Sequence, residues 1–121
     1  MIMSDLEGQI WMDGSFCDWK EAKIHILTHT LHYGTGVFEG VRAYETKSGP
    51  AIFRLEDHTD RLFNSANLVG MNIPFNKETL MQAQCDAVNK NNLKNAYIRP
   101  LCFYGSEGMG LRADNLKVHC A

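Results

Sequence analysis

Apolar and polar residues alternate over short distances in the first part of the chain, which is the pattern of β-strands. Residues 8–19 (GQIWMDGSFCDW) place short apolar runs on both sides of Asp13-Gly14, a dipeptide suited to a tight hairpin turn. Residues 23–29 (KIHILTH) also alternate and contain β-branched side chains. We therefore predict a hairpin followed by an extended segment.

The same pattern returns further along the chain and predicts more strands. Residues 37–45 (VFEGVRAYE) and 51–55 (AIFRL) are expected to be extended, and residues 47–50 (KSGP) supply the turn of a second hairpin. Near the end of the chain, residues 96–105 (AYIRPLCFYG) and 116–121 (LKVHCA) predict two further strands. The last strand is followed by no turn or capping residue, so we expect the chain to be a piece of a longer protein.

Between these strands the apolar period lengthens, which predicts two consecutive helices. The first covers residues 54–70, and Gly70 is placed to end it. Asn76 can cap the second helix, which Asn91-Asn92 closes. The predicted inner faces consist of Leu55, Leu62, Ala66 and Val69, and of Leu80, Ala83, Ala87 and Val88. Hairpins, two helices and more strands predict an α+β fold: an antiparallel or mixed sheet with two helices packed on one face.

Composition excludes several classes of function. The chain has 121 residues, of which 45% are hydrophobic and 21% charged, so one globular domain is expected. A net charge of −2 with scattered basic residues argues against nucleic acid as a partner. Signal peptide and membrane-spanning patterns are missing, so we expect no membrane partner. The four cysteines form no CxxC pair and indicate reduced thiols in the cytoplasm: Cys17, Cys85, Cys102 and Cys120.

Arg99 is the first candidate for chemistry, because it lies in a predicted strand among aliphatic and aromatic residues. A guanidinium without a partner is costly there, so it requires a carboxylate from the protein or from a ligand. Tyr97 lies on the same face of the strand and can add a hydroxyl to a bidentate arginine–carboxylate contact. Glu39 is the candidate internal partner. The residues alone leave an internal ion pair and a carboxylate receptor equally open.

The segment LHYGTGVFEGVRAY, which contains Gly40, combines three glycines with aromatic residues. As a strand it places large side chains around Gly40, on the face that carries Phe38, Arg42 and Tyr44. A glycine in this setting forms a notch where a ligand can approach the main chain, but a β-bulge in an aromatic core has the same pattern. The glycines just upstream leave Tyr33 free to project.

Three other features have ordinary explanations. His25 and His29 lie about 13 Å apart in an extended chain, too far to share one ion, so we expect no metal site. Arg61 has Asp57 one helical turn before it, which predicts a local ion pair. Residues 105–110 (GSEGMG) lack the Lys-Ser or Lys-Thr of a phosphate loop and are expected to be a flexible connector.

Three motifs taken together resemble a known family. HYGTGVFEGVRAYE, IFRLEDHTDRL and NAYIRPL are similar, in this order, to the N-terminal part of the branched-chain amino acid aminotransferases. These are pyridoxal 5′-phosphate enzymes of fold type IV. The likeness runs from about residue 9 to the end of the chain. It implies the family's small N-terminal domain, which forms one wall of a pocket over the cofactor.

The resemblance also implies a role for individual residues. Phe38 resembles part of the apolar surface for the branched side chain, and Gly40 lets the substrate approach the strand. Tyr97 and Arg99 resemble the carboxylate-recognising pair, with Arg99 suited to the distal carboxylate of glutamate. Tyr33 is similar to the tyrosine that reaches the active site across the dimer interface. The implied substrates are amino acids and 2-oxo acids, and a homo-oligomer is expected.

Arg61 resembles the arginine that holds the cofactor phosphate, which replaces the local explanation given above. In the family, the lysine that binds the cofactor covalently lies in a second, C-terminal domain that residues 1–121 lack. We therefore expect this chain to be inactive alone and not to hold pyridoxal phosphate by itself. D-amino acid aminotransferase, aminodeoxychorismate lyase and a stand-alone non-catalytic carboxylate-binding or interaction module remain alternatives.

Overall fold

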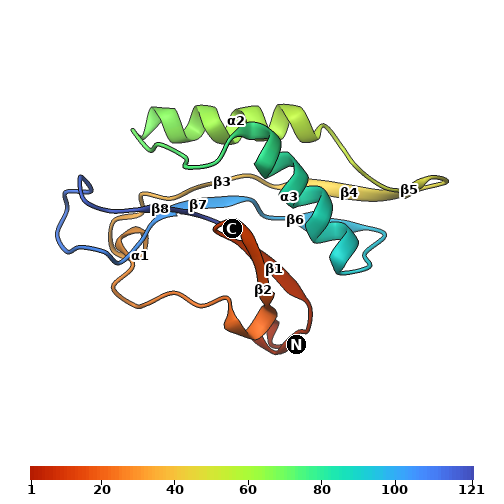
Figure 1. Cartoon of the computed structure of the whole chain (residues 1–121), viewed down its shortest axis with the longest axis horizontal. Coiled ribbons are helices and arrows are strands. Elements are labelled where there is room, and N and C mark those ends of the chain that lie inside the picture. The colour runs from red at the N-terminus through yellow and green to blue at the C-terminus, as the bar shows by residue number, and fades with distance from the viewer.

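The strands of the chain pair in three antiparallel groups. α2 (Leu55–Leu68) runs along one side of them, while α1 (His29–Tyr33) and the first hairpin lie on the other (Figure 1). The computed structural model describes residues 1–121. In chain order the elements are β1 (Gln9–Met12), β2 (Ser15–Asp18), α1 (His29–Tyr33), β3 (Val37–Phe38), β4 (Val41–Thr46), β5 (Gly49–Ile52), α2 (Leu55–Leu68), α3 (Lys77–Lys90), β6 (Ala96–Ile98), β7 (Leu101–Tyr104) and β8 (Val118–Cys120). This arrangement confirms the α+β prediction. None of the helices combines the length and apolarity that crossing a membrane requires.

The first hairpin forms as the sequence predicts. β1 and β2 pair antiparallel, with Trp11 opposite Phe16. The turn residues Asp13 and Gly14 have φ angles of 50° and 101°, in the left-handed region that this dipeptide tolerates well. The backbone N–H of Asp13 donates to the carbonyl of Cys120 at 2.9 Å. The turn is therefore fixed to the C-terminal strand.

The prediction of an extended segment at residues 23–29 is wrong. No strand forms there, and α1 begins at His29. Thr28 bends the chain, because its hydroxyl donates to the carbonyl of His25 at 2.6 Å. His29 is buried, and its Nδ1 lies 3.1 Å from the hydroxyl oxygen of Thr35. Local side-chain hydrogen bonds and burial of His29 therefore override the alternating pattern.

Two predicted strands are each interrupted, so that two three-stranded sheets form. β7 lies between β3 and β8, whereas β4 lies between β5 and β6. The break between β6 and β7 falls at Arg99-Pro100, because proline lacks the N–H that the ladder needs. The carbonyl of Pro100 still accepts a hydrogen bond from the backbone N–H of Glu39 at 3.0 Å. The two breaks therefore lie side by side.

Side chains alternate between two faces from β3 through β4 despite the break. Val37, Glu39, Val41 and Ala43 are buried, with the Glu39 side chain directed toward α2. The side chains between them belong to the opposite face, as predicted: Phe38, Arg42 and Tyr44, with Gly40 among them. The alternation thus separates a buried acid from an exposed aromatic surface.

α2 and α3 confirm the two predicted helices and the residues that end them. The Asn76 side chain accepts a hydrogen bond from the backbone N–H of Thr79 at 2.8 Å and caps α3. Gly70, with a φ of 71°, follows the end of α2. Val69 was predicted to face inward but is exposed, because α2 ends one residue before it. The buried helix positions are Thr59, Leu62 and Ala66 in α2 and Leu80, Ala83, Gln84 and Val88 in α3.

Candidate functional site

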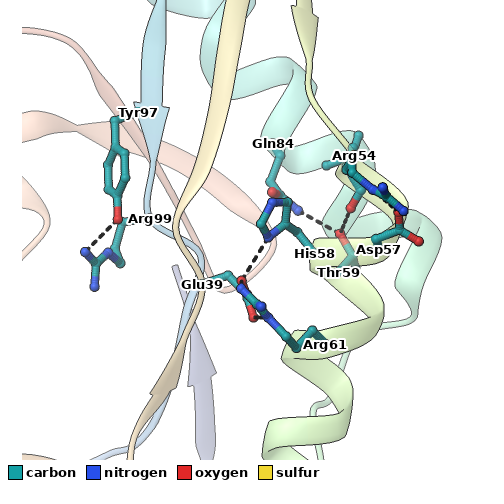
Figure 2. A network of polar contacts seen from close by, with 10 residues as sticks. Glu39, Arg54, Asp57, His58, Thr59, Arg61, Gln84, Tyr97 and Arg99 are labelled. Carbon is teal, nitrogen blue, oxygen red and sulfur yellow. Dashed lines mark hydrogen bonds and ion pairs between the residues drawn. The ribbon is translucent and has the colours of Figure 1, made fainter.

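Part of the predicted substrate site gathers on the sheet face opposite α2. We call this the open face and define it by Phe38, Gly40, Arg42, Tyr97 and Arg99. Tyr97 in β6 is paired directly with Arg42 in β4. Figure 2 shows Tyr97 and Arg99 on the side of the strands that faces away from α2. The alternation of two neighbouring strands therefore assembles the open face.

Arg99 lies between two aromatic rings and has no acid as a partner. Its Nη2 donates to the Tyr97 hydroxyl at 2.9 Å. The guanidinium carbon lies 4.2 Å from the Phe38 ring centroid and 5.4 Å from that of Tyr97. Cation–π contacts of this kind hold the guanidinium without neutralising it. The candidate ion pair with Glu39 does not form, so the positive charge of Arg99 remains available to an external carboxylate.

Gly40 makes room for Tyr97. A methyl group at position 40 would collide with the Tyr97 hydroxyl and lie 3.2 Å from the ring carbon that bears it. The space that the sequence marks as a notch for a ligand is thus filled by the phenol in this structure. The strand register is the same before and after Gly40, so no bulge lies there, and its φ is not positive. The close approach of Tyr97 therefore explains this glycine.

Arg42 belongs to the open face although the resemblance assigned it no role. Its guanidinium carbon lies 5.8 Å from the centroid of the Tyr97 ring. Tyr97 therefore has two arginines near its ring, and one of them, Arg99, also donates to its hydroxyl. The signal in the sequence was the alternation that put Arg42 on the face of Phe38.

Glu39 occupies the opposite side of the strands and is the centre of a second polar cluster (Figure 2). Its side chain is only 4% exposed. Arg61 donates to it through Nε at 2.6 Å and Nη2 at 2.7 Å, and the Nδ1 of His58 lies 3.0 Å from Oε2. The hydrogen bonds from Arg61 lower the pKa of Glu39 against the opposing effect of burial. Glu39 is therefore ionised at neutral pH.

The predicted local ion pair between Arg61 and Asp57 is wrong. Asp57 instead accepts from Arg54 Nε at 2.6 Å, and Arg61 reaches across to the sheet. The hydrogen bonds to Glu39 raise the pKa of Arg61. The Arg61 side chain is 67% exposed, and no hydrogen bond engages its Nη1. A fixed guanidinium with free N–H groups toward solvent fits a phosphate monoester.

Tyr33 lies apart from the open face. It is the last residue of α1, and its ring centroid is 4.6 Å from that of His29. Its exposed side chain makes no hydrogen bond, aromatic contact or cation–π contact with Phe38, Tyr97 or Arg99. Within one copy of the chain, the structure therefore brings together four of the five predicted substrate residues.

His119 forms a third polar cluster that the sequence did not indicate. Its Nδ1 lies 2.6 Å from Asp13 Oδ2, and its Nε2 lies 2.9 Å from Glu107 Oε1. Burial alone would lower the pKa of His119, but the hydrogen bonds to the two carboxylates overcome this and raise it. Both ring nitrogens face acceptors, so the protonated ring is the form that fits. This cluster joins the first hairpin and the 105–117 loop to β8.

The open face of this α+β domain thus combines an arginine without an acidic partner, a tyrosine hydroxyl and a phenylalanine ring, which is the chemistry of carboxylate recognition. The chain belongs to the amino-transferase class IV family, whose pattern matches residues 36–120. It is 60% identical over 119 residues to a branched-chain-amino-acid aminotransferase of Pseudomonas aeruginosa, a match that covers 98% of this chain and 39% of the relative. The corresponding enzyme of Escherichia coli is 46% identical over 102 residues, or 84% of this chain and 33% of the relative.

Solved structures give the same result. A crystal structure of the Escherichia coli branched-chain amino acid aminotransferase matches with a TM-score of 0.91 and 40% identity, over 95% of this chain and 38% of that one. The branched-chain aminotransferase of the thermophilic archaeon Thermoproteus uzoniensis, solved with norvaline, matches with a TM-score of 0.89 and 36% identity, over 94% and 39%. The chain therefore spans about two fifths of the length of these relatives.

Proposed function

We propose that this chain is the N-terminal, substrate-recognition domain of a branched-chain amino acid aminotransferase. The full-length protein would move an amino group between leucine, isoleucine or valine and 2-oxoglutarate. The similar proteins support this assignment, because they are branched-chain aminotransferases and the matches to them cover nearly the whole chain. The remaining three fifths of such a protein would supply the cofactor-anchoring domain and its lysine.

The observation that carries the proposal is the unneutralised guanidinium of Arg99 over the Phe38 ring. The proposed reaction requires one pocket to accept an apolar branched side chain and, in the other half-reaction, the acidic side chain of glutamate. Phe38 supplies apolar surface, and Arg99 at its edge binds the distal carboxylate without placing an acid in the pocket. Tyr97 shares this recognition and Gly40 allows its position.

Tyr33 completes the site in this proposal only if it comes from a second copy of the chain. Its exposure and its separation from the open face within one copy support that origin. The segment before it also presents apolar side chains to solvent, which suits a surface that a partner covers in a homo-oligomer. These exposed side chains are Ile24, Ile26, Leu27 and Leu31.

The family uses pyridoxal 5′-phosphate, which supplies the electron sink for the transfer of the amino group. We assign its phosphate to Arg61, whose exposed guanidinium has free N–H groups. The 121-residue chain is not expected to hold the cofactor by itself. The four free thiols support a reducing, cytoplasmic location.

The test is a substrate panel with the full-length protein that contains residues 1–121. We expect amino transfer from leucine, isoleucine and valine to 2-oxoglutarate, and little from D-alanine. Strong activity with D-alanine and none with leucine would assign the domain to a D-amino acid aminotransferase instead. Lyase activity on aminodeoxychorismate would assign it to the third member of the fold type.

A further inference from the structure

Glu39 is the buried acid of the chain, and the side chains of Arg61 and His58 both contact it. Both of its oxygens are engaged, Oε1 by Arg61 Nε and Oε2 by Arg61 Nη2 and His58 Nδ1 (Figure 2). The three contacts measure 2.6, 2.7 and 3.0 Å. Burial of a carboxylate is costly, so three charge-assisted contacts are needed to hold it there.

The geometry leaves Arg61 constrained along one edge only. Nε and Nη2 form the edge that binds Glu39, and Nη1 on the other edge has no hydrogen-bond partner. A long arginine side chain on an exposed helix surface normally samples several rotamers. A bidentate contact to a carboxylate that is itself fixed removes this freedom. Arg61 is thus exposed and yet fixed in position.

His58 restricts the cluster further. It precedes Arg61 by three residues, so both project from the same side of α2 toward the strands. The His58 ring contacts the same Oε2 that binds Arg61 Nη2. The plane of the Glu39 carboxylate is therefore fixed from two positions of the helix, and that plane sets the orientation of the guanidinium.

We propose that Glu39 is a positioning residue for the cofactor phosphate, acting through Arg61, with His58 as its support. This inference rests on the proposed function, which assigns the phosphate to Arg61. Glu39 itself touches no phosphate, because its carboxylate is buried and would repel it. It fixes the free edge of the guanidinium where the phosphate monoester binds. Phosphate binding then does not have to immobilise the arginine side chain, which would cost conformational entropy.

The test measures the binding of two probes to the apo form of the full-length protein: pyridoxal 5′-phosphate and pyridoxal, which lacks the phosphate. Glu39→Gln removes the charge and the second acceptor oxygen while keeping the shape. We expect it to weaken the binding of pyridoxal 5′-phosphate about tenfold and to leave that of pyridoxal unchanged. His58→Gln should act in the same direction, by about threefold.

The double variant distinguishes positioning from an independent contribution. If Glu39 acts through Arg61, then Glu39→Gln added to Arg61→Ala should cause no further loss of phosphate-dependent affinity. The ³¹P resonance of the bound cofactor should shift in Glu39→Gln, which a purely structural tie between α2 and the sheet would not cause. Glu56→Gln is the matched control, because Glu56 pairs with Lys77 on the neighbouring helix and does not contact Arg61. We expect no change in this variant.

Two results would overturn the inference. Equal weakening of both probes in Glu39→Gln would mean that Glu39 only stabilises the domain, as would unchanged phosphate binding together with a lower melting temperature. If Glu39→Gln does not fold, Glu39→Asp keeps the charge and shortens the reach, and the same comparison of probes applies to it. Failure of the wild-type protein to bind pyridoxal 5′-phosphate at all would instead reject the proposed function.

Discussion

Arg61 and Arg99 lie on opposite sides of the same strands, and only Arg61 has an acid beside it. Arg61 is paired with the buried carboxylate of Glu39 at 2.6 Å. Arg99 contacts only neutral groups, the Phe38 and Tyr97 rings and the Tyr97 hydroxyl. The alternation of one strand causes the difference, because it directs Glu39 to α2 and Phe38 to the open face.

One small domain can thus hold one arginine in an internal ion pair and leave another free to bind a ligand. An arginine that already has its acid is oriented but partly neutralised, whereas one held by aromatic rings keeps its full charge. The sheet separates the two, so that the acid of the first cannot reach the second.

The largest effect is expected from the removal of the receptor. In the full-length protein, Arg99→Leu should reduce kcat/KM for glutamate by a factor on the order of 10²–10³, because the distal carboxylate loses its charged partner. The value for leucine should change by only about two- to fivefold, since this substrate loses no charged partner and only the contacts of Arg99 with Phe38 and Tyr97 are removed. Steady-state kinetics of the two half-reactions measure this.

Arg42→Leu is the matched control for that experiment, because it also removes a cation from the open face. Arg42 contacts the Tyr97 ring at 5.8 Å but makes no contact with Phe38. We expect both substrates to be affected alike and by less than about fivefold. An Arg99→Leu enzyme that loses leucine and glutamate activity equally would refute the receptor function.

The second prediction concerns the position of Tyr97. Gly40→Ala introduces a methyl group where the Tyr97 hydroxyl lies, so the ring must move away from Arg99. We expect about a tenfold loss of glutamate activity, since the tyrosine and arginine no longer act together. The unfolding free energy should fall by about 1–3 kcal/mol, as measured by urea denaturation.

Gly108→Ala is the control for a glycine without such a constraint. The added methyl group would meet only Leu116, at 3.4 Å, which is an ordinary contact. The stability should then stay within about 0.5 kcal/mol of the wild type. If Gly40→Ala is equally mild, Tyr97 is not held against the main chain and the structural explanation of Gly40 is wrong.

The sequence predicts most of the fold, because capping and turn residues act locally. Asn76, Gly70 and Asp13-Gly14 all occur where the structure uses them. The interruption at Pro100 was missed although the missing N–H of proline is a local signal. The helix at His29 was missed because the burial of this residue depends on residues distant in the chain. His29, for example, also contacts the carbonyl of Leu111 at 3.2 Å.

The ion pairs are less predictable than the fold, because spacing favours near neighbours. Arg61 has an acid one turn away in Asp57, yet it pairs with Glu39, 22 residues distant. The buried carboxylate attracts the guanidinium more strongly than a solvated one does. Only the assembled sheet shows that Glu39 lies next to Arg61 and not next to Arg99. Arg99 is therefore the arginine without an acidic partner.

The third prediction tests the ion pair between Arg61 and Glu39 through the pH dependence of stability. The pKa of Glu39 is lowered in the folded state, so its contribution to stability is present above the unfolded pKa, about 4.3, and is lost as the pH falls through the lower folded pKa. We expect wild type to exceed Glu39→Gln by about 1–3 kcal/mol at pH 7 and to converge with it in strong acid. Urea denaturation between pH 7 and pH 3 measures the difference. A gap that does not depend on pH would assign the loss to packing.

The smallest effect is expected at His119, and its sign is opposite to that at Glu39. The folded pKa of His119 is raised from 6.5, so its contribution to stability is complete below that value and disappears as the pH rises through the raised pKa. We expect His119→Asn to cost about 0.5–1 kcal/mol at pH 5.5 and less at pH 9, by urea denaturation. The guanidinium of Arg61 cannot lose its proton in this range, whereas the His119 imidazolium can. The ion pair of His119 with Asp13 should therefore weaken in alkali, whereas that of Arg61 with Glu39 should not. Equal pH profiles for His119→Asn and Glu39→Gln would contradict this.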